Sequence, residues 1–482
     1  MKHLILILSV FFSVSAMAQY TLPTISTHYH AAGIEGTRSL VRTYNDSVMI
    51  IYNQTAIRTN DNQFLALTNR STSAIVMDIP ADYEVAEMEI VGQWCFFGGK
   101  QYCGFSQNSL QTICHGYIGK FYIPDFLAGS GTVEFYTLTD VYEVTRLTAF
   151  KAGGEDRWGI LAIAKETKTS SHRVLVELLN YVLPGGLWTC KIGTTTDPQE
   201  YFQDVSAHGS DVFVISSILP QDTDPAVNYP DTILYVRSAK KEMILDRYGS
   251  GLYRRTRINV SPLTAHINLP IKATMIPTYY NHSAILLSCG DMEGDRGIGI
   301  LHLDESSFTV DFAQEVLSTN GNWTLDDVAF IERDTTCLFL GPLPLYSTNG
   351  MFSLARLHQV STPLTYPGYA LGYHNEVIQS LTNLGQSDIA TVGYTAEKKL
   401  TYTVIMKYFI PNPQNRCYDR AFGVKYLTKE IEFPSTEDMK INNDPRPGEW
   451  NSRSYETRRT LIKRDCQIEF KRGTVLSEEE TE

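Results

Sequence analysis

The sequence predicts an all-β protein, a β-propeller with seven blades as the favoured number, on three observations. A strand, a short polar turn and a more apolar strand recur seven times along the chain. These strands alternate apolar and polar residues or are apolar throughout, as half-buried and buried strands do. Helical apolar periodicity is nearly absent, which disfavours α/β folds and their nucleotide sites. Six or eight blades, or two β-sandwiches, are the alternatives.

The repeat is located by the residue at which the second strand of each unit begins. The average distance between successive starts is about 57 residues, near the period of known propeller repeats, with insertions accounting for the excess. These starts are Val48, Trp94, Trp158, Val212, Ala284, Thr336 and Asp388.

The two ends of the chain are assigned separately from the repeats. Residues 1–18 are predicted to be a secretory signal peptide, because Lys2 is followed by an apolar run from Leu4 to Val14 and by Ala16-Met17-Ala18. They resemble signal peptides of Bacteroidota, which predicts a periplasmic, surface or secreted protein. Residues 19–434 are assigned to the propeller. Residues 435–482 are polar and are predicted to be an irregular C-terminal extension with an acidic tail.

Closure of the ring requires strands from the chain ends, because an open ring leaves an unpaired edge. The sequence offers residues 20–39, Val424–Leu427 and Cys466–Phe470 for the first or last blade.

Composition and cysteine spacing exclude several classes of protein. The chain has 482 residues and is 43% hydrophobic, which is typical of a folded protein. A formal net charge of -12 argues against a broad nucleic-acid-binding surface. No later segment reaches the roughly 18 apolar residues of a transmembrane helix. None of the eight cysteines has CxxC spacing. The pairs Cys95 with Cys103, Cys103 with Cys114, and Cys417 with Cys466 remain open as disulfides, and Cys289 and Cys337 are interpreted as buried thiols.

Candidate functional residues fall into a few short segments. Tyr248, Tyr253, Arg254 and Arg255 lie in a stretch interpreted as a long loop and are of the types enriched at binding interfaces. An ordinary exposed loop is the competing interpretation.

Two segments suggest metal binding. Asp291, Glu293 and Asp295 alternate as in oxygen-ligand loops for Ca²⁺, without the distal Glu of an EF-hand, so a polar hairpin turn is the alternative. His28 and His30 share a strand face but lack a third ligand. No other cofactor is predicted.

Two further patterns are weaker indications of a functional site. Asp204 and His208 can be an acid–base pair or merely flank a strand and its turn. Residues 318–323, Ser-Thr-Asn-Gly-Asn-Trp, resemble the Asp-box turn of sialidases and related propellers, with Asn320 in place of the expected Asp.

Two functional hypotheses follow. The first is a non-catalytic binding or assembly module for protein or glycan partners at the cell envelope. The alternative is a carbohydrate-active hydrolase or lyase with its site in the centre of the propeller, which requires carboxylates clustered there with one titrating abnormally.

Overall fold

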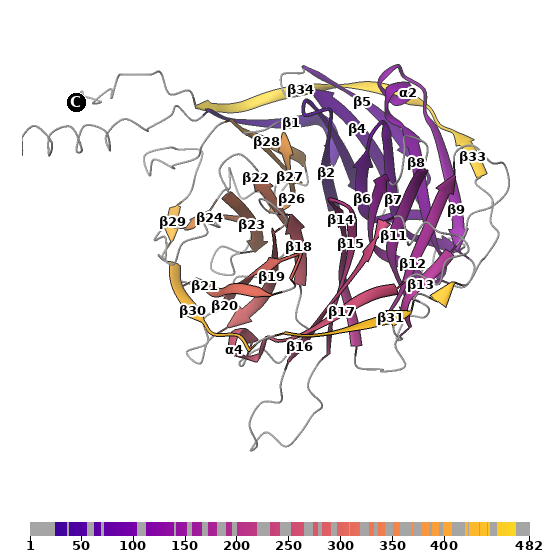
Figure 1. The fold of residues 1–482 in the computed structure, drawn as a ribbon. Coiled ribbons are helices and arrows are strands. Elements are labelled where there is room, and N and C mark those ends of the chain that lie inside the picture. Colours follow the sequence, from indigo (N-terminus) through magenta and orange to yellow (C-terminus); the bar gives the residue numbers. More distant parts are fainter. Residues whose placement is uncertain are drawn as a thin grey trace, which may run out of the picture.

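The computed structural model describes the strands of the ring and some of the turns that join them (Figure 1). The described residues are 25–35, 38–54, 62–68, 72–103, 112–138, 141–151, 157–165, 172–180, 189–194, 200–218, 232–241, 252–264, 273–277, 282–290, 296–307, 309–318, 327–331, 336–342, 350–356, 368–370, 377–384, 388–394, 399–406, 420–422, 424–432, 434–440, 442–443 and 451–468. The predicted signal peptide and the metal-loop candidates Asp291, Glu293 and Asp295 lie outside them.

The protein is all-β, with antiparallel sheets arranged around a common centre, so the predicted propeller fold is confirmed (Figure 1). Two short helices, α2 (Ile123–Leu127) and α4 (Ser261–Thr264), are the helical elements in the described part of the chain.

The largest sheet contains both ends of the ring. Its order is β2-β3-β4-β5-β34-β1-β28-β27-β26. The bounds are β2 (Arg38–Tyr44), β3 (Val48–Gln54), β4 (Asn62–Thr68), β5 (Ser73–Ile79), β34 (Thr457–Ile468), β1 (Ile25–Glu35), β28 (Lys399–Met406), β27 (Asp388–Tyr394) and β26 (Val377–Leu384).

Five further sheets each pair four consecutive strands with one strand from the C-terminal part of the chain. They are β6 (Tyr83–Val91), β7 (Trp94–Cys103), β8 (Thr112–Tyr122), β9 (Thr132–Leu138) with β33 (Asn451–Ser454); β10 (Glu143–Lys151), β11 (Arg157–Lys165), β12 (His172–Asn180), β13 (Thr189–Thr194) with β32 (Asn442–Asn443); β14 (Glu200–His208), β15 (Asp211–Ile218), β16 (Ile233–Lys240), β17 (Leu252–Asn259) with β31 (Ser435–Lys440); β18 (Ala273–Pro277), β19 (His282–Gly290), β20 (Arg296–Asp304), β21 (Val310–Ser318) with β30 (Val424–Lys429); and β22 (Asp327–Ile331), β23 (Thr336–Pro342), β24 (Gly350–Arg356), β25 (Gly368–Ala370) with β29 (Arg420–Phe422).

Each five-stranded sheet thus contains one group of four consecutive strands. The nine-stranded sheet contains two four-stranded groups, the first made of β2 to β5 and the last made of β26 to β28 with β1. The first strand of each group, which is β26 in the last, lies innermost. In the described chain these strands contact one another in a closed circle, β2-β6-β10-β14-β18-β22-β26 and back to β2. Ring closure uses β1, which pairs with β28 from Ile25↔Met406 onward, so the residues before Ser39 complete the last group, as one of the sequence alternatives predicts.

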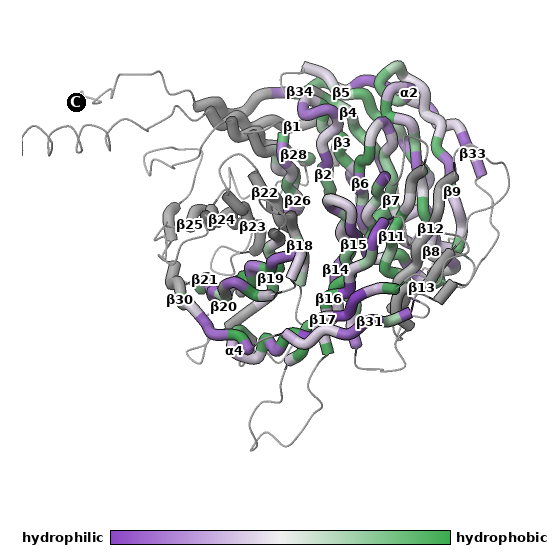
Figure 2. Tube along the Cα trace, viewed as in Figure 1, coloured by the Kyte–Doolittle hydropathy of each residue, from purple (hydrophilic) through white to green (hydrophobic). Residues whose placement is uncertain are grey.

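Apolar strands pack the sheets against each other. In β3, five successive residues from Met49 to Asn53 are buried, four of them hydrophobic, as expected of a strand covered on both faces. Figure 2 shows the green, hydrophobic segments within the sheets. The largest described core joins the sheets of β3 and β7, where the rings of Phe64 and Phe97 lie 4.9 Å apart between centroids.

Cys95 belongs to this core and is a free, buried thiol. The Cys95–Cys103 pairing that the sequence left open is therefore ruled out. Both residues lie on β7, eight positions apart, and a strand of that length separates them by about 26 Å. The side chains of the other cysteines lie outside the described residues.

The C-terminal strands β29 to β34 form what we call the belt. They pair in turn with β25, β21, β17, β13 and β9, and β34 then pairs with both β5 and β1, so the belt runs around the outside of the ring in the reverse order of the chain (Figure 1). Figure 2 shows its strands β31 and β33 as largely pale or purple.

The belt corrects two expectations. Residues 435–465 were expected to be irregular, yet β31, β32, β33 and most of β34 lie there. Val424–Leu427 was offered for the first or last blade, yet it pairs with β21. The physical reason is that a polar, exposed outer strand is held through backbone hydrogen bonds and so lacks the apolar alternation of a core strand. None of the helices in the described part of the chain is long and apolar enough to cross a membrane.

Candidate functional site

Polar side chains gather where the innermost strands meet. In β6, β10, β14 and β26 the pairing register shifts at the same place, immediately before Glu87, Arg146, Asp204 and Ser380. Such bulges re-aim the following side chain and are frequent next to active sites. The four strands therefore place a polar residue at an equivalent point around the ring.

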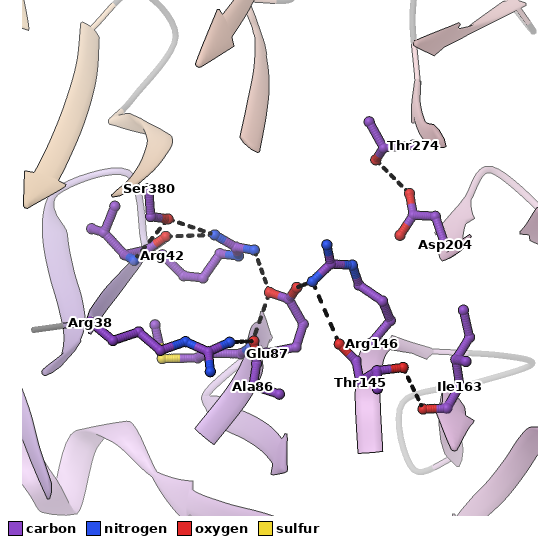
Figure 3. Close-up of polar contacts among 12 residues, drawn as sticks. Arg38, Arg42, Ala86, Glu87, Thr145, Arg146, Ile163, Asp204, Thr274 and Ser380 are labelled. Atoms are coloured by element: carbon purple, nitrogen blue, oxygen red, sulfur yellow. Dashed lines mark hydrogen bonds and ion pairs between the residues drawn. The ribbon is translucent and has the colours of Figure 1, made fainter. Parts of the chain in front are cut away.

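Glu87 is the centre of this group (Figure 3). Its Oε1 lies 2.7 Å from Nη2 of Arg42 on β2, and its Oε2 lies 3.2 Å from Nη1 of Arg146 on β10. Nη1 of Arg42 also donates to the Ser380 hydroxyl at 3.5 Å, which links β2 to β26. One carboxylate thus joins three neighbouring sheets through two guanidinium groups.

Asp204 extends the group to the next sheet. Its Oδ2 accepts hydrogen bonds from the Thr274 hydroxyl at 2.5 Å and from the Met275 backbone N–H at 3.0 Å, both on β18. Loss of hydration raises the pKa of Asp204, although the positive charge of Arg146 and these two hydrogen bonds act in the opposite direction. The axial group, as we call it, consists of Arg42, Glu87, Glu89, Arg146 and Asp204.

Glu89 has the most unusual carboxyl of the axial group. It follows Glu87 by two residues on β6, and the residue keeps some exposure although the surrounding protein desolvates its carboxyl. This desolvation raises the pKa of Glu89 to about 7, with Arg42 lowering it and the charges of Glu87 and Asp204 raising it further. Glu89 is therefore substantially protonated at neutral pH.

A second set of charges lies beside the starts of the innermost strands. Arg38 Nη1 is 3.0 Å from Glu84 Oε1, and Lys100 Nζ is 3.2 Å from the same oxygen. Lys100 and Lys165 both lie near Glu143, at 3.6 Å and 3.5 Å. These charges alternate in sign from β2 to β11 and connect three sheets.

The residues predicted to bind a ligand lie elsewhere. Tyr253, Arg254 and Arg255 are on β17, a strand at the rim covered by β31, and not in a loop. Tyr253 is 5% exposed and belongs to a core cluster, while Arg255 Nε donates to Glu437 of the belt at 2.6 Å. Tyr248 is outside the described residues. The structure therefore gives Tyr253 and Arg255 packing and pairing partners within the chain.

Asp204 and His208 do not pair with each other. His208 Nδ1 is 2.9 Å from Glu305, its Nε2 is 3.3 Å from the Ser283 hydroxyl, and its ring stacks on Phe213. Ser283 is fully buried and the side chains of His208 and Glu305 are 12% and 14% exposed, so this cluster joins two sheets largely away from solvent. Asp204 lies in the middle of β14 and His208 is its last residue, next to the turn, as the strand-and-turn alternative describes.

No cluster of three or more metal-ligating side chains occurs among the described residues. His28 and His30 lie on β1, opposite Thr403 and Thr401, with side chains outside the description.

Of the axial group, only Asp204 was singled out from the sequence, because the group is assembled from strands of different repeats. A signal does exist in the sequence: Val85-Ala-Glu-Met-Glu89, Val144-Thr-Arg-Leu-Thr148, Phe202-Gln-Asp-Val-Ser206 and Ile378-Gln-Ser-Leu-Thr382 share one pattern of apolar and polar positions. Aligning the first strands of the repeats would have placed Glu87, Arg146, Asp204 and Ser380 at one level.

Comparison with known proteins gives limited likeness. No protein-family model and no curated protein matches the chain. Among solved structures, a GH32 β-fructofuranosidase of Bombyx mori, in a mutant form in complex with sucrose, aligns with a TM-score of 0.28 and 11% identity. Another structure of the same enzyme aligns with a TM-score of 0.27 and 10% identity. Each alignment covers 86% of this chain and 94% of that chain.

Proposed function

We propose that the protein is a glycoside hydrolase that uses Glu89 as its general acid and Glu87 as its general base. The observation that carries the proposal is the raised pKa of Glu89, about 7, two residues from a carboxylate that ion-pairs with Arg42 and Arg146. Two neighbouring carboxyls in different protonation states are what acid–base cleavage of a glycosidic bond requires.

The strand geometry supports this pairing. After the bulge, β6 is regular, with Glu87↔Gly98, Met88↔Phe97 and Glu89↔Phe96 as partners. Residues two apart on a regular strand point to the same side, about 7 Å apart. Inverting hydrolases hold their two carboxyls about 6.5 to 9.5 Å apart to leave room for a water molecule. The 7 Å is a distance between Cα atoms, and carboxyls that keep it fall within the inverting range, so we propose an inverting mechanism.

The roles follow from the charges. Protonated Glu89 donates its proton to the oxygen of the departing sugar, and Glu87 accepts a proton from the attacking water. Arg42 and Arg146 orient the Glu87 carboxylate, and Asp204 keeps negative charge near Glu89, which favours the protonated form of Glu89. The glycan predicted as a partner is then the substrate. With the signal peptide predicted at residues 1–18, we propose that the reaction takes place outside the cytoplasm.

The test is a cleavage screen with the whole protein. Neutral and acidic oligosaccharides and polysaccharides are incubated with it, and the anomeric configuration of newly formed ends is followed by proton NMR. We expect cleavage of at least one glycan with inversion, which is lost in Glu89→Gln and kept in Glu134→Gln, a carboxyl on β9 paired with Lys120.

The competing outcomes are distinct. Cleavage with retention would exclude the Glu87 and Glu89 roles while leaving a hydrolase. Binding of a glycan without cleavage of any substrate would reject the proposal and favour the non-catalytic binding module.

A further inference from the structure

The belt is an added strand on groups that are already complete without it. Within the sheet of β6 to β9, for example, the four strands pair with one another in sequence order, and β33 pairs only with the outer strand β9. The same holds for β29 to β32 on the other five-stranded sheets. This is the geometry in which an extended peptide adds to a sheet edge.

Apolar anchors hold the belt at separate points. Leu427 and Ile431 pack on the core of β15 to β21, and Met439 packs on the core next to Tyr253. Tyr455 packs on the aromatic core, and Ile462 is 9% exposed in the core shared by the first and last groups. The residues between these anchors, such as those of β33, are exposed. The belt therefore resembles a docked peptide with spaced side-chain pockets.

Tyr455 is the anchor with the most complete description. Its ring lies edge-on to Phe135 with 6.3 Å between centroids, and its N–H donates to the Gly131 carbonyl at 2.9 Å. A Cβ on Gly131 would lie 2.0 Å from the Tyr455 carbonyl oxygen, so this close crossing of two backbones requires glycine.

Charged pairs fix the register of the belt. Lys429 Nζ is 3.0 Å from Glu315, whose side chain is 1% exposed, and Arg458 is 3.1 Å from Asp78 on β5. Together with the Arg255–Glu437 pair, they give β30, β31 and β34 each a matching charge on the sheet that they join. These contacts specify the belt sequence and not merely an extended strand.

We propose that the belt is an exchangeable strand donor and that the outer sheet edges accept the belt of a second copy of this chain. A second copy presents the same anchors and charges in the same order, so exchange needs no new contact, which is the basis of domain swapping. The four-stranded groups stay paired while the belt is transferred. Strands β29 to β33 lie at the ends of the five-stranded sheets, and β34 lies between two groups, β2 to β5 and β26 to β28 with β1, that are each paired without it.

The test begins with the full chain. A specific protease site is placed between residues 407 and 419, ahead of β29, and the purified protein is cut. One batch carries a fluorescent label at its C-terminus. The two batches are mixed, and native mass spectrometry follows the labelled belt. We expect label to appear on unlabelled rings while circular dichroism retains the sheet signal.

Anchor variants make the test specific. Unlabelled belts are compared as competitors of the labelled belt for binding to the ring. A belt with Tyr455→Ala should compete at least tenfold less well than the unaltered belt. A belt with Ser452→Ala, which alters an exposed residue of β33, should compete as well as the unaltered belt. Uncut chains at the same concentration should form dimers. Label that never transfers, unfolding on cleavage, equal competition by Tyr455→Ala, or uncut chains that stay monomeric would each overturn the proposal.

Discussion

Glu89→Gln is expected to lower kcat on the cleaved glycan by about 10²- to 10⁴-fold, the contribution typical of a general acid. Glutamine keeps the shape of the protonated side chain but has no proton to transfer. In the wild-type protein the alkaline limb of the kcat/KM profile should fall near pH 7, because the pKa of Glu89 is raised to about 7. Rates measured from pH 4 to 9 check both points.

The same substitution should make the folded protein more stable above neutral pH. Desolvation raises the pKa of Glu89 from 4.5 to about 7, so its protonated form favours the folded state. That contribution is complete below pH 4.5 and is lost as the pH rises through 7. Glutamine does not titrate, so the gain in free energy of unfolding should grow from near zero at pH 4.5 to on the order of 2 to 3 kcal/mol above pH 7.

Glu134→Gln serves as the control for the activity measurement, since Glu134 lies on β9, outside the axial group, and is paired with Lys120. A variant Glu89→Gln with full activity would contradict the catalytic role, even if it showed the stability gain. If the difference in free energy of unfolding between Glu89→Gln and the wild-type protein stayed constant from pH 4.5 to 8, the raised pKa of Glu89 would be contradicted.

The ring could be predicted because each repeat carries its own signal. The anchors Val48, Trp94, Thr336 and Asp388 are the first residues of β3, β7, β23 and β27. Trp158, Val212 and Ala284 fall within two residues of the starts of β11, β15 and β19. Local alternation and apolar runs suffice for this level, since strands of one group are neighbours in sequence.

The belt and the axial group depend on contacts between distant parts of the chain. Tyr455 meets Gly131, and Arg42 meets both Glu87 and Ser380, across separations that no spacing rule covers. The loop expected around Tyr253 is a strand that pairs with β16 on one side and, from the far end of the sequence, with β31 on the other. Local pattern therefore fails where pairing is long-range and the exposed strand is polar.

Arg237→Leu is expected to lower the free energy of unfolding by about 3 to 5 kcal/mol, the usual result of breaking a buried ion pair. The Arg237 side chain is 3% exposed and pairs with Glu200, whose side chain is 7% exposed. Nη1 of Arg237 donates to the Ser216 hydroxyl at 2.6 Å, and the guanidinium lies over the Phe202 ring at 5.1 Å. Removing Arg237 leaves a carboxylate in this site without a counter-charge.

A double substitution separates the cost of the orphaned charge from the value of the pair. Replacing both partners, Glu200→Leu with Arg237→Met, should recover most of the loss, because no charge then remains buried. Lys240→Met is the matched control on the same strand, β16. Its ion pair with Asp211 spans 2.6 Å but Lys240 is 54% exposed, so its loss should cost less than about 1 kcal/mol.

Urea titrations of the four proteins measure these differences, and equal losses for Arg237→Leu and Lys240→Met would show that burial does not strengthen the pair. Recovery in the double variant would show that the Glu200–Arg237 pair is needed to neutralise two buried charges and adds little net stability of its own.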